Sequence, residues 1–195
     1  MFTVDGFVEE CRAALDEAAP TLAVKEFVGR AVADRREVTR ELGEPARGQL
    51  RVLYSSAELT IVHAVWAPCM SLYPHDHRMW AVIGIYGGAE DNVFFRRVPG
   101  GIADAGGRTL RDRDVAVLGP EAIHSVTNPE RAFTGAIHVY GGDFLGVERS
   151  EWDARTLKER PYDLERVRGV FEAANERAPQ LLGTTAQGRR VDQRT

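Results

Sequence analysis

Three histidines have the spacing of metal ligands: His75 and His77, which flank Asp76, and His124 further along the chain. Side chains alternate along a strand, so residues at i and i+2 point to the same face of a sheet. The turn at Gly119-Pro120 leads into the short apolar stretch that carries His124. If the two segments are neighbouring strands, the three imidazoles converge on one ion. The pattern therefore predicts a three-histidine metal centre in a small β-barrel.

The ligand set narrows the chemistry. Trp80, Ala81 and Val82 follow His77 where a carboxylate ligand could lie, and we do not expect the more distant Glu90 to bind the metal. Imidazole suits iron, zinc, copper or nickel, and three protein ligands leave positions open for a substrate and dioxygen. A structural site usually has four protein ligands, so the pattern indicates a catalytic centre. The spacing alone leaves the metal open.

His138 and Tyr140 form a second i, i+2 pair. If their face lines the barrel, both side chains point toward the metal cavity, and the histidine can orient the tyrosine hydroxyl. The pair would then transfer a proton or position a bound oxygen species. The alternative is a packed aromatic residue beside a core histidine. His63 lies in another apolar stretch that is predicted to be a strand. Its side chain points either into the barrel or to the outer face.

These residues need a scaffold, and the sequence predicts helices before and after a set of strands. Apolar residues recur at spacings of three and four in two stretches that predict helices: Phe7, Val8, Cys11, Ala14 and Leu15, then Leu22, Phe27, Val28, Ala31 and Val32. Gly43 and Pro45 end the second helix. A terminal helix is predicted over residues 162–174, with four apolar residues on one face.

Between the helices, β-branched and aromatic runs alternate with glycine and proline. Strands are predicted at residues 50–54, 58–66, 80–86, 92–98, 114–118, 123–127 and 133–140, with a further strand at the histidine pair. Short strands at regular spacing indicate a barrel or jelly roll. We expect one domain: an N-terminal helical segment (1–48) packed on a barrel (49–150), which the chain leaves after Gly141-Gly142, then a helical extension (151–182) and a disordered tail (183–195).

Composition limits the partners. The 195 residues carry a net charge of −4, with a pI of about 5.8, which argues against nucleic acid or an anionic membrane as the main partner. No apolar run has the length of a membrane helix. The two cysteines, Cys11 and Cys69, form no disulfide framework, so a reducing cytoplasm is the expected location. We expect a monomer or homodimer.

Three motifs resemble a known group. Pro-His-Asp-His, Gly-Pro-x-x-Ile-His-x-x-x-Asn and Ile-His-Val-Tyr-Gly-Gly-Asp-Phe resemble the cupin superfamily, and within it thiol dioxygenases of the cysteine dioxygenase type, over residues 50–148. The resemblance implies a mainly β fold, the cupin double-stranded β-helix or jelly-roll barrel, here with N-terminal helices and a C-terminal helix. It also implies a non-haem Fe(II) ion, with Zn or Ni as alternatives, and addition of both atoms of O2 to a small thiol.

Residue by residue, the resemblance makes His75, His77 and His124 the metal ligands, His138 and Tyr140 the catalytic pair, and Trp66 a family tryptophan near the site. The chain also departs from the family. Val82 stands where a crosslinking cysteine is found, Ala136 replaces a serine, and Tyr54-Ser55-Ser56 lacks the arginine that binds the substrate carboxylate. Predicted substrate contacts are Arg78, Trp66 and Tyr54, and the other arginines considered are Arg51, Arg96 and Arg97.

The sequence thus predicts an Fe(II)-dependent dioxygenase of the thiol dioxygenase type, an oxidoreductase acting on O2 and a small-molecule substrate. One alternative is a three-histidine cupin dioxygenase that cleaves carbon–carbon bonds in diketones or hydroxylated aromatics. Another is a zinc or nickel cupin that acts as an isomerase, hydrolase or small-molecule binding module. The identity of the substrate is open.

Overall fold

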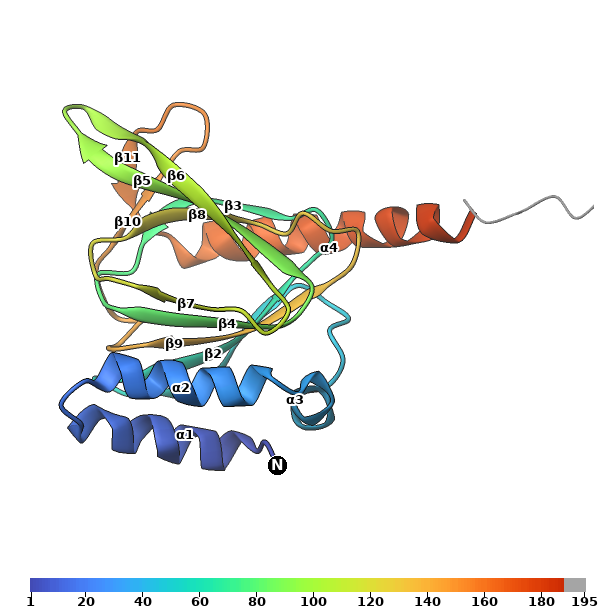
Figure 1. Ribbon diagram of the computed structural model, residues 1–195. Helices are drawn as coiled ribbons and strands as arrows, with labels where there is room; N and C mark the ends of the chain where they lie inside the picture. The colour runs from blue at the N-terminus through green and yellow to red at the C-terminus, as the bar shows by residue number, and fades with distance from the viewer. Residues whose placement is uncertain (188–195) are drawn as a thin grey trace, which may run out of the picture.

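The computed structural model describes residues 1–187, which form two facing antiparallel sheets with helices against one of them (Figure 1). The first sheet has the order β1 (Gln49–Ser55), β2 (Thr60–Trp66), β9 (Thr134–Tyr140), β4 (Ala81–Gly87), β7 (Val115–Leu118). The second has the order β11 (Glu159–Pro161), β10 (Ser150–Trp152), β3 (Ser71–Asp76), β8 (Ile123–Thr127), β5 (Ala89–Val98), β6 (Gly101–Arg111).

The pairing of the strands identifies the fold. β2 pairs with β9, β3 with β8, β4 with β7 and β5 with β6, all antiparallel. Such nested pairing across two sheets is the jelly roll, or double-stranded β-helix. The predicted fold class, mainly β with helices at both ends, is confirmed.

The central strands of the first sheet are buried on both faces. β2, β4 and β9 contain only buried residues. On β2, Val62, Ala64 and Trp66 belong to the core between the sheets, whereas Ile61 belongs to a second core beneath the N-terminal helices. Both the inward-facing and the outward-facing positions of these strands are therefore apolar, because burial of either face removes apolar surface from water.

The N-terminal helices are α1 (Val4–Ala13), a short 3-10 helix (Ala14–Asp16), α2 (Pro20–Val32) and α3 (Arg35–Leu42). α2 lies against the first sheet, and α1 packs against α2 (Figure 1). The predicted second helix is interrupted, because the Asp34 side chain accepts hydrogen bonds from the backbone N–H groups of Arg36 and Glu37 and so caps α3. At Gly84 a Cβ would lie 2.4 Å from a Val28 methyl, so glycine lets α2 approach β4 closely.

The C-terminal helix α4 (Leu164–Gln187) closes one side of the inner core. Its residues Val167, Phe171 and Ala174 are buried, and the Phe171 ring stacks on Trp66 with 5.5 Å between the ring centroids. The predicted tail from residue 183 begins within α4. Residues 188–195 lie outside the part that the structure describes.

The sequence did not predict β6, β10 or β11. β6 is rich in glycine and joins β5 through a turn in which Gly100 has a φ of 86°. The expectation that the chain leaves the barrel after Gly141-Gly142 was wrong, because Glu151 on β10 pairs with His75 on β3. The buried Glu151 carboxylate also accepts hydrogen bonds from Arg160 and Arg166, which ties this returning segment to α4. Burying such a carboxylate is favourable only with partners of this kind.

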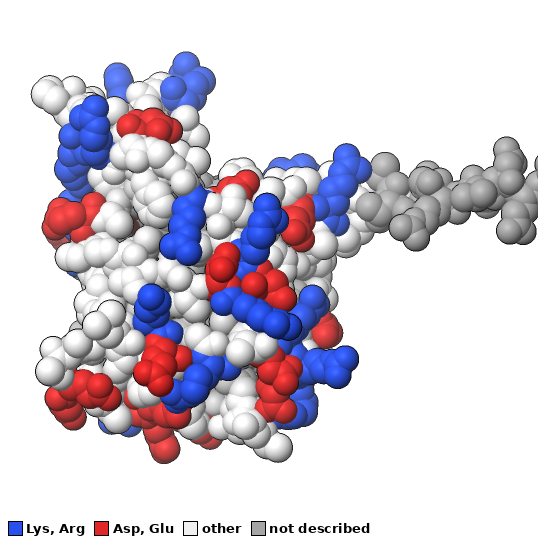
Figure 2. Space-filling view, in the orientation of Figure 1, with Lys and Arg blue, Asp and Glu red and all other residues white. Residues whose placement is uncertain are grey.

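Figure 2 shows basic and acidic side chains interspersed on the face viewed, without an extended area of one sign. Within residues 1–187, none of the helices combines the length and the apolar composition that a membrane span needs.

Candidate metal centre

The three predicted histidines lie together between the sheets. His75 on β3 is directly opposite His124 on β8, and His77 follows immediately after β3. One ring nitrogen from each residue lies within 4.8 Å of the others, and all three side chains are buried. This group could hold a metal ion.

The spacing of the nitrogens fits a single ion. Nε2 of His124 lies 3.3 Å from Nε2 of His77. Two nitrogens that are each about 2.1 Å from one metal ion, at octahedral to tetrahedral angles, are roughly 3.0–3.4 Å apart. The observed contact therefore has the dimension of two ligands of one ion.

Hydrogen bonds orient two of the rings. Nδ1 of His75 lies 3.0 Å from the Tyr73 carbonyl oxygen, which can only accept, so Nδ1 carries the proton. Nδ1 of His124 lies 2.7 Å from Oδ1 of Asn92, which likewise accepts. In both residues the lone pair is then on Nε2, as metal binding at that atom requires. Nδ1 of His77 has no hydrogen-bond partner among the described residues.

The environment keeps these imidazoles neutral. Burial lowers the pKa of His75 to about 4. Burial, together with the charges of the neighbouring histidines, holds the pKa values of His77 and His124 well below the ordinary value. All three lone pairs are therefore available at neutral pH, and the donor set fits a divalent transition metal.

His138 and Tyr140 lie beside the three histidines on the inner face of β9. The Tyr140 hydroxyl lies 3.0 Å from Nδ1 of His138, and the Tyr140 and His77 ring centroids are 5.0 Å apart. Burial raises the pKa of Tyr140, so the hydroxyl keeps its proton at neutral pH. The structure thus brings the predicted pair next to the candidate ligands.

Glu90 is a site residue that the sequence reasoning missed. Its fully buried carboxylate accepts hydrogen bonds from Nε1 of Trp66 at 2.7 Å and from Nδ2 of Asn92 at 3.0 Å. Its Oε2 lies 3.7 Å from Nε2 of His138, an ion-pair distance. Burial alone raises its pKa, but His138, Asn92 and Trp66 more than offset this, so the pKa lies below its usual value and the group is charged. β5 begins at Ala89, whereas the sequence predicted this strand only from Asn92.

Arg149 is the second residue that was missed. It is 7% exposed, and its guanidinium carbon lies 3.9 Å from the ring centroids of both Phe144 and Tyr162. Phe144 stacks on Tyr140 with ring centroids 4.0 Å apart, and the ring centroids of Tyr162 and His75 are 6.1 Å apart. One Arg149 nitrogen donates to the Phe144 carbonyl, whereas its buried Nε has no partner among the described residues. A positive charge therefore lies in the wall of the site.

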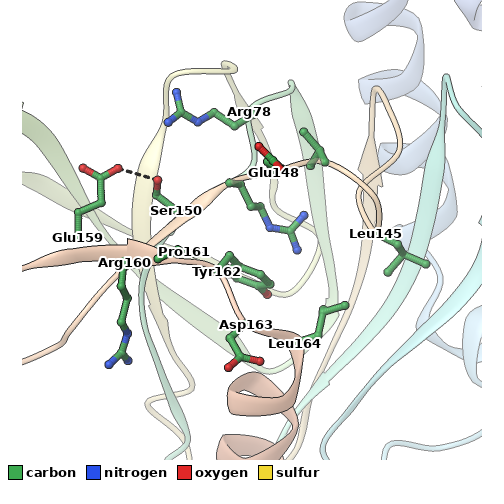
Figure 3. Close-up of a pocket in the computed structure, with 12 residues that line it drawn as sticks. Arg78, Leu145, Glu148, Ser150, Glu159, Arg160, Pro161, Tyr162, Asp163 and Leu164 are labelled. Atoms are coloured by element: carbon green, nitrogen blue, oxygen red, sulfur yellow. Dashed lines mark hydrogen bonds between the residues drawn. The ribbon is translucent and has the colours of Figure 1, made fainter.

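A cavity of about 840 Å³ opens on the outer side of this wall (Figure 3). Its lining includes Arg149, Tyr162, Arg78 and Arg160, together with acidic side chains such as Glu159. Arg149 and Tyr162 are common to the cavity and to the surroundings of the three histidines. The three histidines themselves are not among the lining residues of the cavity.

The predicted substrate contacts have different locations. Trp66 lies inside the barrel against Glu90. Arg78 lines the outer cavity, and its Nε lies 2.9 Å from Oδ2 of Asp76. Tyr54 packs with the core beneath the N-terminal helices, so the structure does not bring it to the histidines, and its role as a substrate contact stays a prediction.

Other residues considered from the sequence also lie apart from the candidate ligands. His63 points to the outer face of β2, where its Nε2 lies 2.7 Å from the Tyr86 hydroxyl. Arg51 donates to the Leu42 carbonyl, and Arg97 pairs with Asp76 and Glu159. Arg96 is exposed.

No protein-family model matches this sequence. Similar solved structures include an RmlC-like cupin family protein with a double-stranded β-helix fold from Methanocaldococcus jannaschii, with 11% identity and a TM-score of 0.45 over 53% of this chain and 89% of that one. A cupin superfamily protein from Desulfitobacterium hafniense has 16% identity and a TM-score of 0.41 over 51% and 84% of the two chains. A Cupin 2 conserved barrel domain protein from Salinispora arenicola has 22% identity and a TM-score of 0.40 over 48% and 74%. The likeness concerns the fold alone.

Proposed function

We propose that this protein is a mononuclear non-haem iron dioxygenase that oxidises a small, negatively charged thiol to a sulfinic acid. The observation that carries the proposal is the set of three buried, neutral imidazoles whose ligand atoms lie within 4.8 Å of one another. Three protein ligands leave coordination positions open, as a catalytic centre requires. The motif resemblance to thiol dioxygenases supports the choice of reaction.

The reaction is balanced without another reactant. A thiol R–SH and O2 give R–SO2H: the S–H and O–O bonds break, two S–O bonds form, and the hydrogen moves from sulfur to oxygen. Sulfur loses four electrons and dioxygen gains them. A ferrous ion held by His75, His77 and His124 would supply the redox chemistry that joins dioxygen to sulfur.

Tyr140 and His138 are suited to hold the proton that the thiol releases. When Nδ1 of His138 is unprotonated, the tyrosine hydroxyl donates to it across 3.0 Å, and the tyrosine oxygen can accept a hydrogen bond from a group in the site. A proton accepted by Tyr140 can pass to Nδ1 as the hydroxyl proton moves along its existing hydrogen bond. The Glu90 carboxylate lies 3.7 Å from Nε2 of His138, on the other side of the ring from Tyr140.

Arg149 is suited to bind the acidic group of the substrate. Its guanidinium is largely removed from water, and a buried N–H at Nε is without a partner among the described residues. Arginine binds carboxylates through paired, charge-assisted hydrogen bonds, which are stronger than neutral ones. The arginine that the first barrel strand lacks is thus replaced by one from the segment between β9 and β10. We therefore favour thiols that carry a carboxylate.

The first experiment is metal analysis of protein purified without a histidine tag, combined with oxygen-electrode assays after anaerobic addition of Fe(II). Three thiols of similar size serve as probes: 3-mercaptopropionate, 2-mercaptoethylamine and 2-mercaptoethanol. We expect about one equivalent of iron, and oxygen uptake with one sulfinate formed per O2 that is fastest for the acidic thiol.

Two outcomes would overturn the proposal. Bound zinc or nickel with no oxygen uptake after Fe(II) reconstitution would indicate a non-oxidative enzyme or binding module. Oxygen uptake with diketones or hydroxylated aromatics, giving cleaved carbon products and no sulfinate from any thiol, would indicate the carbon-cleaving alternative.

A further inference from the structure

Glu90 connects two parts of the site that are otherwise separate. One oxygen of its carboxylate accepts from the amide N–H of Asn92 at 3.0 Å, and Asn92 in turn contacts Nδ1 of His124 at 2.7 Å. The other oxygen accepts from Trp66 at 2.7 Å and lies 3.7 Å from Nε2 of His138. A single buried carboxylate thus reaches a candidate metal ligand through Asn92 and the Tyr140 partner directly.

The direction of the first chain of hydrogen bonds follows from donor and acceptor chemistry. An ionised carboxylate only accepts, so the NH2 group of Asn92 must face Glu90. The amide oxygen of Asn92 then faces Nδ1 of His124, which must carry the proton. Nε2 of His124 is left with its lone pair, directed toward Nε2 of His77 at 3.3 Å.

The second connection starts from the same carboxylate, but it is electrostatic, because Nε2 of His138 forms no hydrogen bond with the described residues. Negative charge at Glu90 favours a proton on Nε2 of His138. Nδ1 of His138 then has the lone pair that accepts the hydroxyl hydrogen of Tyr140, 3.0 Å away. The carboxylate thereby determines which way the Tyr140 hydroxyl points.

We propose that Glu90 is a positioning residue that sets the tautomers of both His124 and His138, and so prepares the metal ligand and the proton-accepting pair together. The His124 part depends only on the three-histidine site. The His138 part rests on the proposed function, because only turnover reports on Tyr140. Hydrogen-bond partners of metal ligands commonly contribute 10- to 100-fold in metal affinity, which sets the size of the expected effect.

The decisive variant is Glu90→Gln, which keeps the shape but has one acceptor oxygen in place of two. Trp66 and Asn92 both donate to Glu90, so one of them loses its acceptor in this variant. If the amide of Asn92 flips, its NH2 group faces Nδ1 of His124, which must then accept a hydrogen bond. The His124 proton is then on Nε2, and that nitrogen can no longer bind a metal ion. We expect Fe(II) and Zn(II) to bind roughly 10- to 100-fold more weakly, and the Nδ1–H form of His124 to be lost from 15N spectra of the metal-free protein.

The matched variant is Glu90→Gln combined with Asn92→Asp. Here the new amide at position 90 accepts from Trp66 through its oxygen and donates through its NH2 group to the new carboxylate at position 92. That carboxylate only accepts, so it restores the acceptor for Nδ1 of His124. Metal affinity and the His124 tautomer should return to the wild-type values. Turnover should stay low, because the charge next to His138 is gone. Simple loss of packing at position 90 would not be repaired in this way.

The proposal is overturned if Glu90→Gln leaves the His124 tautomer and the metal affinity unchanged, or if the double variant restores neither. Should Glu90→Gln fail to fold, the double variant carries the test: a folded protein with the Nδ1–H tautomer supports the proposal, and an unfolded one contradicts it. Because the spectra use metal-free protein, these results do not depend on whether any thiol is oxidised. Failure of the oxygen assay would therefore count against the proposed function and the His138 part that rests on it, and would leave the His124 part standing.

Discussion

Nε2 of His77 and Nε2 of His124 face each other across 3.3 Å inside the barrel. The lone pair of His124 lies on this nitrogen, because its Nδ1 proton is directed to Asn92. Metal binding at both atoms requires that His77 also present a lone pair, and a cation between the two nitrogens compensates their repulsion. The folded protein therefore holds two candidate ligand atoms at this distance.

This pair leads to a prediction about stability. Fe(II) at about 100 times its dissociation constant should stabilise the folded protein by about 2.7 kcal/mol under anaerobic conditions. His77→Gln should lose that stabilisation, measured as the Fe(II)-dependent change in the free energy of unfolding. His63→Gln, a change at a buried histidine on the other face of the sheet, should keep it. Equal stabilisation of both variants would contradict the assignment of His77 as a ligand.

Tyr140→Phe should lower kcat by roughly 100-fold or more, the usual contribution of a positioned acid–base group. Iron content and metal affinity should stay at the wild-type level, because the hydroxyl bonds to His138 and not to a candidate ligand. Tyr86→Phe is the control, since it removes a buried hydroxyl on the outer face that contacts His63. If Tyr140→Phe keeps full turnover, the hydroxyl has no part in the mechanism.

Arg149→Gln should raise KM for an acidic thiol roughly 10- to 100-fold, because a hydrogen bond to a charged group contributes about 1.5–3 kcal/mol. KM for 2-mercaptoethanol should change much less. Arg78→Gln is the matched variant, since Arg78 lines the same cavity but pairs with Asp76. Steady-state kinetics of the two variants show which arginine binds the acidic group. A larger rise in KM for Arg78→Gln would favour Arg78, the contact predicted from the sequence.

His63 should make the stability depend on pH. Burial lowers its pKa from 6.5 to about 4, and the positive charge of Arg51 acts in the same direction. Between these values the unfolded chain binds more protons than the folded one, so stability falls as the pH falls from about 6.5 toward 4. His63→Gln should remove about 2–3 kcal/mol of the difference in unfolding free energy between about pH 7 and about pH 4.5. Urea unfolding at the two pH values measures this difference, and an unchanged difference in the variant would rule out His63 as its source.

Much of the scaffold could be predicted because its signals are local. Helical spacing in the first 45 residues and apolar strands such as β4 follow from which faces of each element are buried. β6 was not predicted, because its glycines are typical of turns. In the structure these residues form a strand, because they pair with β5. β10 and β11 are only three residues each, and their positions follow from contacts with β3 and with each other.

For the site, the sequence by itself determined the three candidate ligands and the His138–Tyr140 pair. The i, i+2 spacings of His75 with His77 and of His138 with Tyr140 predicted which side chains lie together. Both pairs do lie together in the folded protein, although β3 ends at Asp76, just before His77. Only the tertiary structure decided which face is inside. It placed Tyr54 and His63 beneath the helices, and it brought Glu90 and Arg149 to the site from β5 and from the segment after β9. The reason is physical: periodicity reports burial along one element, whereas the partners of a buried charge come from strands far apart in the chain.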